Sequence, residues 1–320
     1  MTTWYYTNIV LIQSTFTTLL LALSLQVPMR VGVFSFAGVG CFGLGGYAAA
    51  IAMTRFDMST AESVAVGTAL AGVAALLLGL LVQRLTGLYL AMATVAFTLI
   101  VSVVAVNGGD LTGGAGGIFG ALGDLQTWHL LVAAVVVVAL LAMTERGAIG
   151  RRVEAVRENP ELAASFGINV TRYRVTAFTV SGVLGGLSGA FTILLRSTVT
   201  PDAISFHLIV LALTVIIVGG WTSWLGALVG SVIFVWLPSM LDFVGDWEAV
   251  VYGAIVALAA VFLPEGVVGL IGATVRRLRR VRRRAGGAGA VPAAAPDADL
   301  PDADAASPAV VPPATRGVTQ

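Results

Sequence analysis

Few side chains in this sequence could bind an ion or move a proton within an apolar environment. A carrier driven by an ion gradient generally has an Asp, Glu, His or Lys deep in the bilayer, because that group must titrate or hold the ion. Here the ionisable residues of the apolar stretches fall at or near their predicted ends: Glu62, His129, Arg196, His207 and Glu248. We therefore expect no catalytic residue and no metal site. Ion-coupled secondary transport of small solutes stays open as the alternative function, since backbone carbonyls at a broken helix could hold sodium.

The basic residues exclude one kind of nucleotide site, because all 18 of them are arginine. A Walker A loop ends in Gly-Lys-Ser/Thr, and its lysine reaches the β- and γ-phosphates of the nucleotide. A chain without lysine has no such loop. If the protein performs active transport, another subunit must hydrolyse the ATP, and no cofactor is expected in this chain.

One polar segment carries the signals of a short helix with both ends capped. Asn159 is a favoured N-cap, and Pro160 suits the first helical position because its missing N–H would be unpaired there. Glu161 complements the positive end of the helix dipole, and Gly167 suits the left-handed position after the helix. Such a short helix is marginal in water, so we expect it to persist only when packed against something.

The elements that flank this segment are apolar and long enough to cross a membrane. Of 320 residues, 58% are hydrophobic and 11% charged, whereas soluble domains carry about 25% charged residues. A spanning helix needs about 20 largely apolar residues. Nine stretches are candidates: 6–27, 31–53, 61–83, 87–107, 127–143, 174–195, 205–219, 222–240 and 248–264. We expect an all-α polytopic integral membrane protein with about nine transmembrane helices, within a range of eight to ten, because 205–240 could also be one span and a re-entrant hairpin.

The arginines predict the orientation of the chain, because cytoplasmic loops collect basic residues. The loop 144–173 and the segment 276–284 are rich in arginine, so both are expected in the cytoplasm. The segments 108–126 and 241–248 contain acidic residues and no arginine, so both are expected outside. Nine spans then place the N-terminus outside and the C-terminus inside.

The chain is expected to have two parts. Residues 1–275 form the predicted membrane domain, which includes the loop 144–173, and residues 276–320 form a juxtamembrane segment and tail. The arginines of 276–284 are expected to lie on anionic lipid head groups. From residue 285 the tail is mainly Ala, Gly, Pro and Asp, which cannot bury enough apolar surface to fold, so we expect a disordered cytoplasmic tail.

Five blocks of the sequence, in order along the chain, resemble one transporter family. The run E-L-A-A-S-F-G at Glu161–Gly167 resembles the E-A-A-x-x-x-G signature of ABC importer permeases, and its surroundings resemble the LivM-type branched-chain amino acid permeases. The other blocks with this resemblance are 34–50, 84–101, 111–118 and 215–234. The resemblance implies a permease of the bacterial plasma (inner) membrane that imports branched-chain amino acids or a similar small polar solute and performs no chemistry on it.

The resemblance also implies partners and a docking role. In the family, the short loop helix docks in a groove of the cytoplasmic ATPase subunit. The residues implied in this coupling are Arg157, Asn159, Pro160, Glu161, Ala163, Ala164 and Gly167. The other implied partners are a second permease subunit, identical or different, and an extracytoplasmic solute-binding protein; nucleic acid is not expected. A membrane scaffold without transport is a further alternative.

Glycine-rich interruptions predict where a solute could pass, because broken helices in matching halves of a transporter are typical of binding sites. The candidate substrate-pathway residues are Ser35, Gly38, Thr94, Thr112, Gly113, Gly114, Ser223 and Gly226. The alternative is that these glycines only let helices pack closely. At 35–40 the chain reads Ser-Phe-Ala-Gly-Val-Gly where relatives often have a polar Ser-Leu-Gly-His run. The substrate therefore stays open among branched-chain amino acids, urea, short amides and aromatic acids.

Overall fold

The computed structural model describes residues 6–241 except 146 and 222, together with isolated positions between 251 and 269. Within these residues, eight helical segments are long and apolar enough to cross a membrane. They are α2 (Ile9–Arg30), α3 (Ala37–Phe56), α4 (Thr60–Val82), α5 (Gly87–Asn107), α6 (Thr127–Glu145), α9 (Val170–Arg196), α10 (Phe206–Gly219, extended to Pro201 by a 3-10 turn) and α11 (Trp224–Leu241). The predicted all-α polytopic class is confirmed. The predicted ninth span, 248–264, lies largely outside the described residues, as does all of 276–320.

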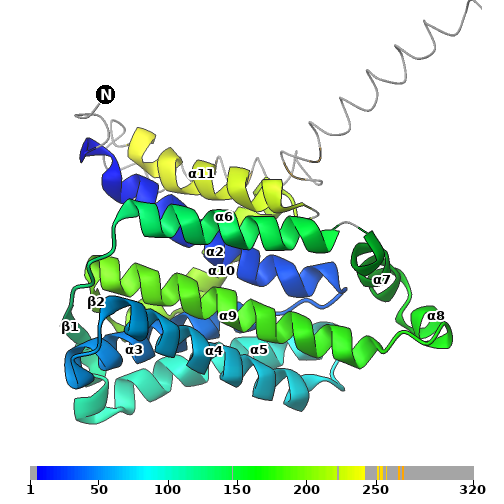
Figure 1. Ribbon diagram of the computed structural model, residues 1–320, viewed down its shortest axis with the longest axis horizontal. Coiled ribbons are helices and arrows are strands. Elements are labelled where there is room, and N and C mark those ends of the chain that lie inside the picture. The colour runs from blue at the N-terminus through cyan, green and yellow to red at the C-terminus, as the bar shows by residue number, and fades with distance from the viewer. Residues whose placement is uncertain are drawn as a thin grey trace, which may run out of the picture. The chain divides into compact units, whose positions relative to one another are not determined.

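The long helices run between two recognisable ends of the bundle (Figure 1). At one end, called the β end, strands β1 (Ile118–Ala121) and β2 (Ser197–Val199) pair antiparallel, with Ile118 opposite Val199. At the other, called the α8 end, lie the short helices α7 (Gly147–Glu158) and α8 (Pro160–Ser165). The two strands were not predicted, because each is a short piece of a connection between apolar helices.

Helices α3 and α9 form the centre of the bundle through glycine contacts. A Cβ added to Gly45 would lie 2.5 Å from Cα of Gly186, and one added to Gly189 would overlap the backbone of Phe42. Small residues of this kind let membrane helices approach closely. By contrast, α4 and α6 have many exposed apolar side chains, such as Leu81 and Leu140. Apolar side chains on the outside of these helices are what a lipid environment requires.

Helix α3 starts later than the predicted span 31–53, because residues 31–36 are not helical. After Arg30 the chain enters an irregular segment that lies between α2 and α3 and begins with a turn, with Gly32 at φ +74°. The N–H of Phe36 donates to Oγ1 of Thr94 at 3.0 Å, and the N–H of Ala37 donates to Oγ of Ser35 at 3.2 Å. Irregular backbone inside a membrane bundle is tolerated where protein groups satisfy its hydrogen bonds. The hydroxyl of Thr94 supplies one such partner, which hydropathy alone could not reveal.

The stretch 205–240 forms two antiparallel helices, α10 and α11, each long and apolar enough to span, which fits two spans and not one span with a re-entrant hairpin. The connection between them, described at Gly220, Trp221 and Ser223 and called the α10–α11 turn, lies at the α8 end, where the N–H of Gly226 donates to the carbonyl oxygen of Ser223 at 2.9 Å. A Cβ on Gly230 would lie 3.1 Å from the carbonyl carbon of Val215. The glycines of this hairpin therefore allow its two helices to pack against each other directly.

Candidate coupling segment and solute cavity

Helix α8 is capped at both ends. Oδ1 of Asn159 accepts the N–H of Leu162 at 2.9 Å, and Pro160 occupies the first helical position. At the other end, Gly167 has φ +80° and donates its N–H to the carbonyl oxygen of Ala164 at 2.9 Å. The helix ends at Ser165 and Phe166 is its C-cap, so Gly167 occupies the left-handed position after the helix that was predicted for it.

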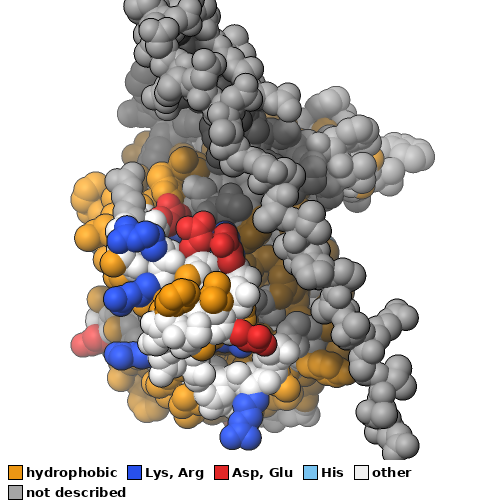
Figure 2. All heavy atoms as spheres, turned by 90° about the vertical axis from the view of Figure 1, so that its right-hand side faces the viewer, with side chains coloured by type: hydrophobic (Ala, Val, Ile, Leu, Met, Phe, Trp, Pro, Cys, Tyr) orange, Lys and Arg blue, Asp and Glu red, His pale blue; other side chains and the backbone are white. Residues whose placement is uncertain are grey.

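Helix α8 presents apolar side chains to its surroundings. Ala163 is only 2% exposed and faces inward, whereas Leu162 is 55% and Phe166 77% exposed. Ala164 is exposed beside them. Figure 2, which looks onto the α8 end, shows apolar side chains between basic and acidic ones. Sequence reasoning did not single out Leu162 and Phe166, although two large apolar residues four positions apart in a polar loop were a visible signal.

Helix α7 connects α8 to the membrane helices. Cζ of Arg157 lies 5.5 Å from the centroid of the Trp221 ring, in the turn between α10 and α11. The backbone of Arg157 also packs on the segment after α2, since a Cβ on Gly32 would lie 3.2 Å from Cα of Arg157. Arg157 therefore contacts two connections of the bundle, the α10–α11 turn and the segment after α2. A displacement of α8 could be transmitted to both through this residue.

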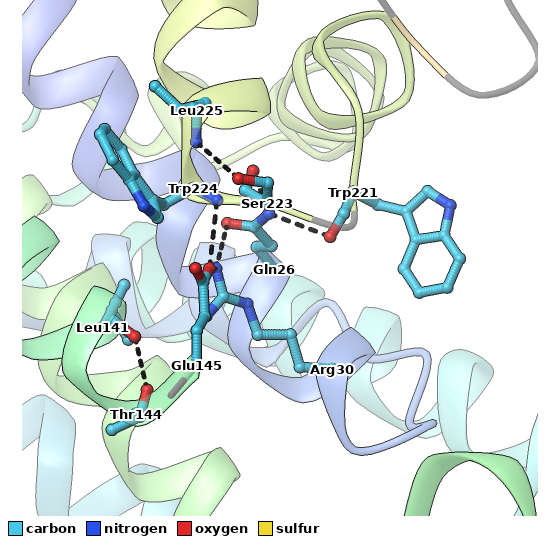
Figure 3. A network of polar contacts seen from close by, with 9 residues as sticks. All are labelled: Gln26, Arg30, Leu141, Thr144, Glu145, Trp221, Ser223, Trp224 and Leu225. Atoms are coloured by element: carbon cyan, nitrogen blue, oxygen red, sulfur yellow. Dashed lines mark hydrogen bonds and ion pairs between the residues drawn. The ribbon is translucent and has the colours of Figure 1, made fainter. Parts of the chain in front are cut away.

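An ion pair joins the ends of α2 and α6 (Figure 3). Nη2 of Arg30 lies 2.7 Å from Oε1 of Glu145, and the two side chains are 13% and 30% exposed. The same carboxylate oxygen lies 3.5 Å from the backbone N of Trp224 at the start of α11. The sequence analysis singled out neither Arg30 nor Glu145, because both fall just beyond the predicted spans 6–27 and 127–143. Their proximity was not predictable, because they belong to different helices far apart in the chain.

Gln26 ties this ion pair to the α10–α11 turn. Its Nε2 donates to the carbonyl oxygens of Trp221 and Ser223, at 2.9 and 2.8 Å, and its Oε1 accepts a 3.4 Å bond from Arg30. Gln26 is completely buried. A buried amide that satisfies two turn carbonyls holds that turn in place, because leaving either group unpaired is costly.

A cavity of about 1090 Å³ opens beside the ion pair; we call it the α6–α9 cavity. Its walls come from α2, α6, α7, the α8–α9 connection and α9. Val27, Leu141 and Val180 make part of its lining apolar, while Arg30 and Glu145 contribute opposite charges. Among the described residues, no group of His, Cys, Asp and Glu side chains could hold a metal ion.

The structure places the predicted pathway residues in three separate regions. Ser35, Gly38 and Thr94 lie together where α3 starts. Thr112, Gly113 and Gly114 lie in the connection between α5 and β1, at the β end. Ser223 lies in the α10–α11 turn and Gly226 in the first turn of α11, both at the α8 end, and of all eight only Ser223 joins the polar network of Figure 3.

Close packing accounts for three of the four glycines among these residues. A Cβ on Gly38 would overlap Oγ of Ser24, and one on Gly113 would overlap the carbonyl oxygen of Gly117. A Cβ on Gly226 would lie 2.7 Å from the carbonyl carbon of Gly220. At Gly114 a Cβ would make only an ordinary contact, 3.6 Å from the carbonyl oxygen of Val106, but its φ is +59°. The packing interpretation is therefore favoured at Gly38, Gly113 and Gly226.

Comparison with known proteins identifies the family. The family model described as "Branched-chain amino acid transport system / permease component" matches residues 8–260. The high-affinity branched-chain amino acid transport system permease proteins LivM of Salmonella typhimurium and Escherichia coli are 25% identical over 284 residues, which are 78% of this chain and 67% of theirs. The fructose import permease protein FrcC of Rhizobium meliloti is 30% identical over 142 residues, 42% of this chain and 39% of its own.

No solved structure matches the chain. The family match covers the two short helices and every long helix described above, so the description as a permease applies to the whole bundle. A permease of this kind is a transport component and not itself an enzyme. The chain is a multi-pass membrane protein that belongs to the family of branched-chain amino acid transport system permease components.

Proposed function

We propose that this chain is the translocating subunit of an ATP-driven importer in the bacterial inner membrane, for branched-chain amino acids or a similar small polar solute. The observation that carries the proposal is helix α8, a capped helix whose Leu162 and Phe166 are exposed at the end of the bundle. So short a helix is not stable alone, and exposed apolar residues on it are suited to a groove in a partner. The partner that we propose is an ATPase subunit, because permeases of this family work together with ATPases.

Charge supports the orientation in which the α8 end faces the cytoplasm. The connections at that end contain Arg84, Arg151, Arg152 and Arg157. The connections at the β end contain Asp57, Asp110, Asp124 and Asp202. Basic residues gather in cytoplasmic loops, so ATPase subunits would dock at the α8 end and a solute-binding protein at the β end. A second permease subunit would complete the membrane core.

In this proposal α7 transmits the movement of the ATPases to the membrane helices. Closure of the ATPases would displace α8, and α7 would carry the displacement to the α10–α11 turn through Arg157 and Trp221. Gln26, Arg30 and Glu145 hold that turn against α2 and α6, so the movement would reach three helices. No ATP binds to this chain in the proposal, and its partners use the nucleotide.

The substrate assignment rests on the extent of the similarity. The similarity to the two LivM proteins extends over 78% of this chain, whereas the similarity to FrcC, named for fructose import, extends over 42%. The experiment is uptake by proteoliposomes that contain this chain, its second permease and its ATPases, with the solute-binding protein and ATP supplied. Leucine uptake that exceeds fructose and urea uptake supports the assignment. Uptake of fructose or urea without leucine contradicts it.

A further inference from the structure

Six charged side chains line the α6–α9 cavity: Arg30, Glu145, Arg152, Glu154, Arg157 and Arg172. Two of them, Arg30 on α2 and Glu145 on α6, form an ion pair between two spanning helices. Arg30 and Glu145 end two spanning helices, yet their side chains are mostly shielded from solvent and both line the cavity. Ionisable groups of membrane helices that face a cavity commonly mark a substrate pathway. The ion pair therefore stands where a solute that passes through this end of the bundle would meet it.

The pair is incompletely satisfied on the arginine side. Arg30 contacts Glu145 and Gln26 through Nη2 alone, and its buried Nε has no hydrogen-bond partner in the structure. A guanidinium can bind a carboxylate through two parallel N–H groups, and a buried N–H without an acceptor is unfavourable. A carboxylate that entered the cavity would supply the acceptor that Nε lacks.

The surroundings of the pair complement a particular kind of solute. Val27 on α2, Leu141 on α6 and Val180 on α9 line the same cavity with aliphatic carbon. A branched-chain amino acid carries a carboxylate, an ammonium group and an aliphatic side chain on one carbon centre. A binding site for it needs a cation, an anion and an apolar wall, and the α6–α9 cavity offers all three.

We infer that the α6–α9 cavity binds the zwitterion of a branched aliphatic amino acid, its carboxylate on Arg30, its ammonium group on Glu145 and its side chain against Val27, Leu141 and Val180. The solute carboxylate would take the place of Glu145 beside Arg30, and the solute ammonium group would take the place of Arg30 beside Glu145. No buried charge is then left unpaired during the exchange. The inference rests on the proposed function, which sets the side of the membrane on which this cavity lies. With the α8 end in the cytoplasm, this is the last site before release.

The two possible roles of the ion pair, holding α2 against α6 or binding solute, lead to different expected results for neutralised variants. If the pair only holds α2 against α6, neutralising one partner leaves the other unpaired, and neutralising both restores stability. If the pair binds solute, the doubly neutral variant lacks both recognition groups and stays defective. The variants Arg30→Gln, Glu145→Gln and the double variant therefore separate the two roles. Arg84→Gln is the matched control, because Arg84 is exposed and lies outside the cavity.

The experiment measures equilibrium binding of radiolabelled leucine to the purified complex of permeases and ATPases in nanodiscs, without the solute-binding protein. We expect Arg30→Gln, Glu145→Gln and the double variant to weaken leucine binding at least about tenfold while the ATPases stay bound, and Arg84→Gln to leave it unchanged. Unchanged binding in the single variants, or restored binding in the double variant, would overturn the inference.

A competition measurement on the unsubstituted complex is independent of how the variants fold. Leucine carries both charges, leucinamide only the ammonium group, and 4-methylpentanoate only the carboxylate. We expect unlabelled leucine to displace the label at least about tenfold better than either analogue; equal displacement by the analogues overturns the inference. Absence of ATP-driven leucine uptake by the same complex would instead contradict the proposed function, so the two failures are distinguishable.

Discussion

The guanidinium of Arg157 lies over the ring of Trp221, with Cζ 5.5 Å from the ring centroid, and so joins helix α7 to the α10–α11 turn. A cation–π contact of this kind is worth about 0.5–2 kcal/mol. Its energy is modest, but its position is specific, because Gln26 holds the backbone of the same residue, Trp221, through a hydrogen bond. The contact is therefore well placed to convert a movement of α8 into a movement of membrane helices.

The first prediction concerns this contact. Arg157→Gln and Trp221→Leu should each lower the amount of leucine taken up per ATP hydrolysed several-fold, because the stacked contact is lost. The amount of bound ATPase should stay the same, since neither residue belongs to α8. The double variant should be no worse than the single ones if the two side chains act through each other. Additive losses would show that the residues act independently.

The second prediction tests the docking face of α8. Ala164 is exposed beside Leu162 and Phe166, so Ala164→Glu would introduce a charge into a close contact with the ATPase. We expect loss of ATPase co-purification and of uptake with normal membrane insertion, because an unpaired charge buried at an interface costs several kcal/mol. Ala148→Glu on α7 places the same charge at an exposed site away from α8 and is the control. Full ATPase binding by Ala164→Glu would contradict the docking assignment.

The third prediction isolates the backbone requirement at Gly167. A Cβ there meets nothing within 4 Å, but its φ is +80°. Gly116 has equally open surroundings without a positive φ, so Gly116→Ala is a matched control. Gly167→Ala should weaken ATPase retention by about 1 kcal/mol, roughly five- to tenfold in affinity, while Gly167→Asn should be milder, because Asn tolerates the left-handed region. Equal retention by Gly167→Ala and Gly116→Ala would show that the turn geometry is irrelevant to docking.

The fourth prediction concerns orientation. Cys41 is buried and can be replaced by alanine to give a cysteine-free background. In whole cells, a membrane-impermeant maleimide should label Gly116→Cys at the β end and should not label Ser165→Cys on α8. After the cells are opened, both positions should react. Labelling of Ser165→Cys in intact cells would reverse the proposed topology and exclude ATPase docking at α8.

Local and non-local features differ in how well the sequence predicted them. The caps of α8 were predicted, because Asn159, Pro160 and Gly167 act on their own neighbouring backbone. Because hydropathy is a local property, the eight described spans were predicted within four residues, except that α3 starts six residues after the start of the predicted span 31–53. The irregular segment 31–36 was not predicted, since its partner Thr94 comes from another helix. The ion pair of Arg30 with Glu145 was missed for the same reason.

The central claim is that ATP hydrolysed by partner subunits, and not an ion gradient, drives uptake through this chain. The most direct measurement is leucine uptake by proteoliposomes that contain the complete complex and its solute-binding protein. Uptake should fall to background when the ATPases lose their Walker lysine, and it should persist when an ionophore removes the proton and sodium gradients at constant ATP. Uptake that follows the gradients and ignores the Walker substitution would contradict the account.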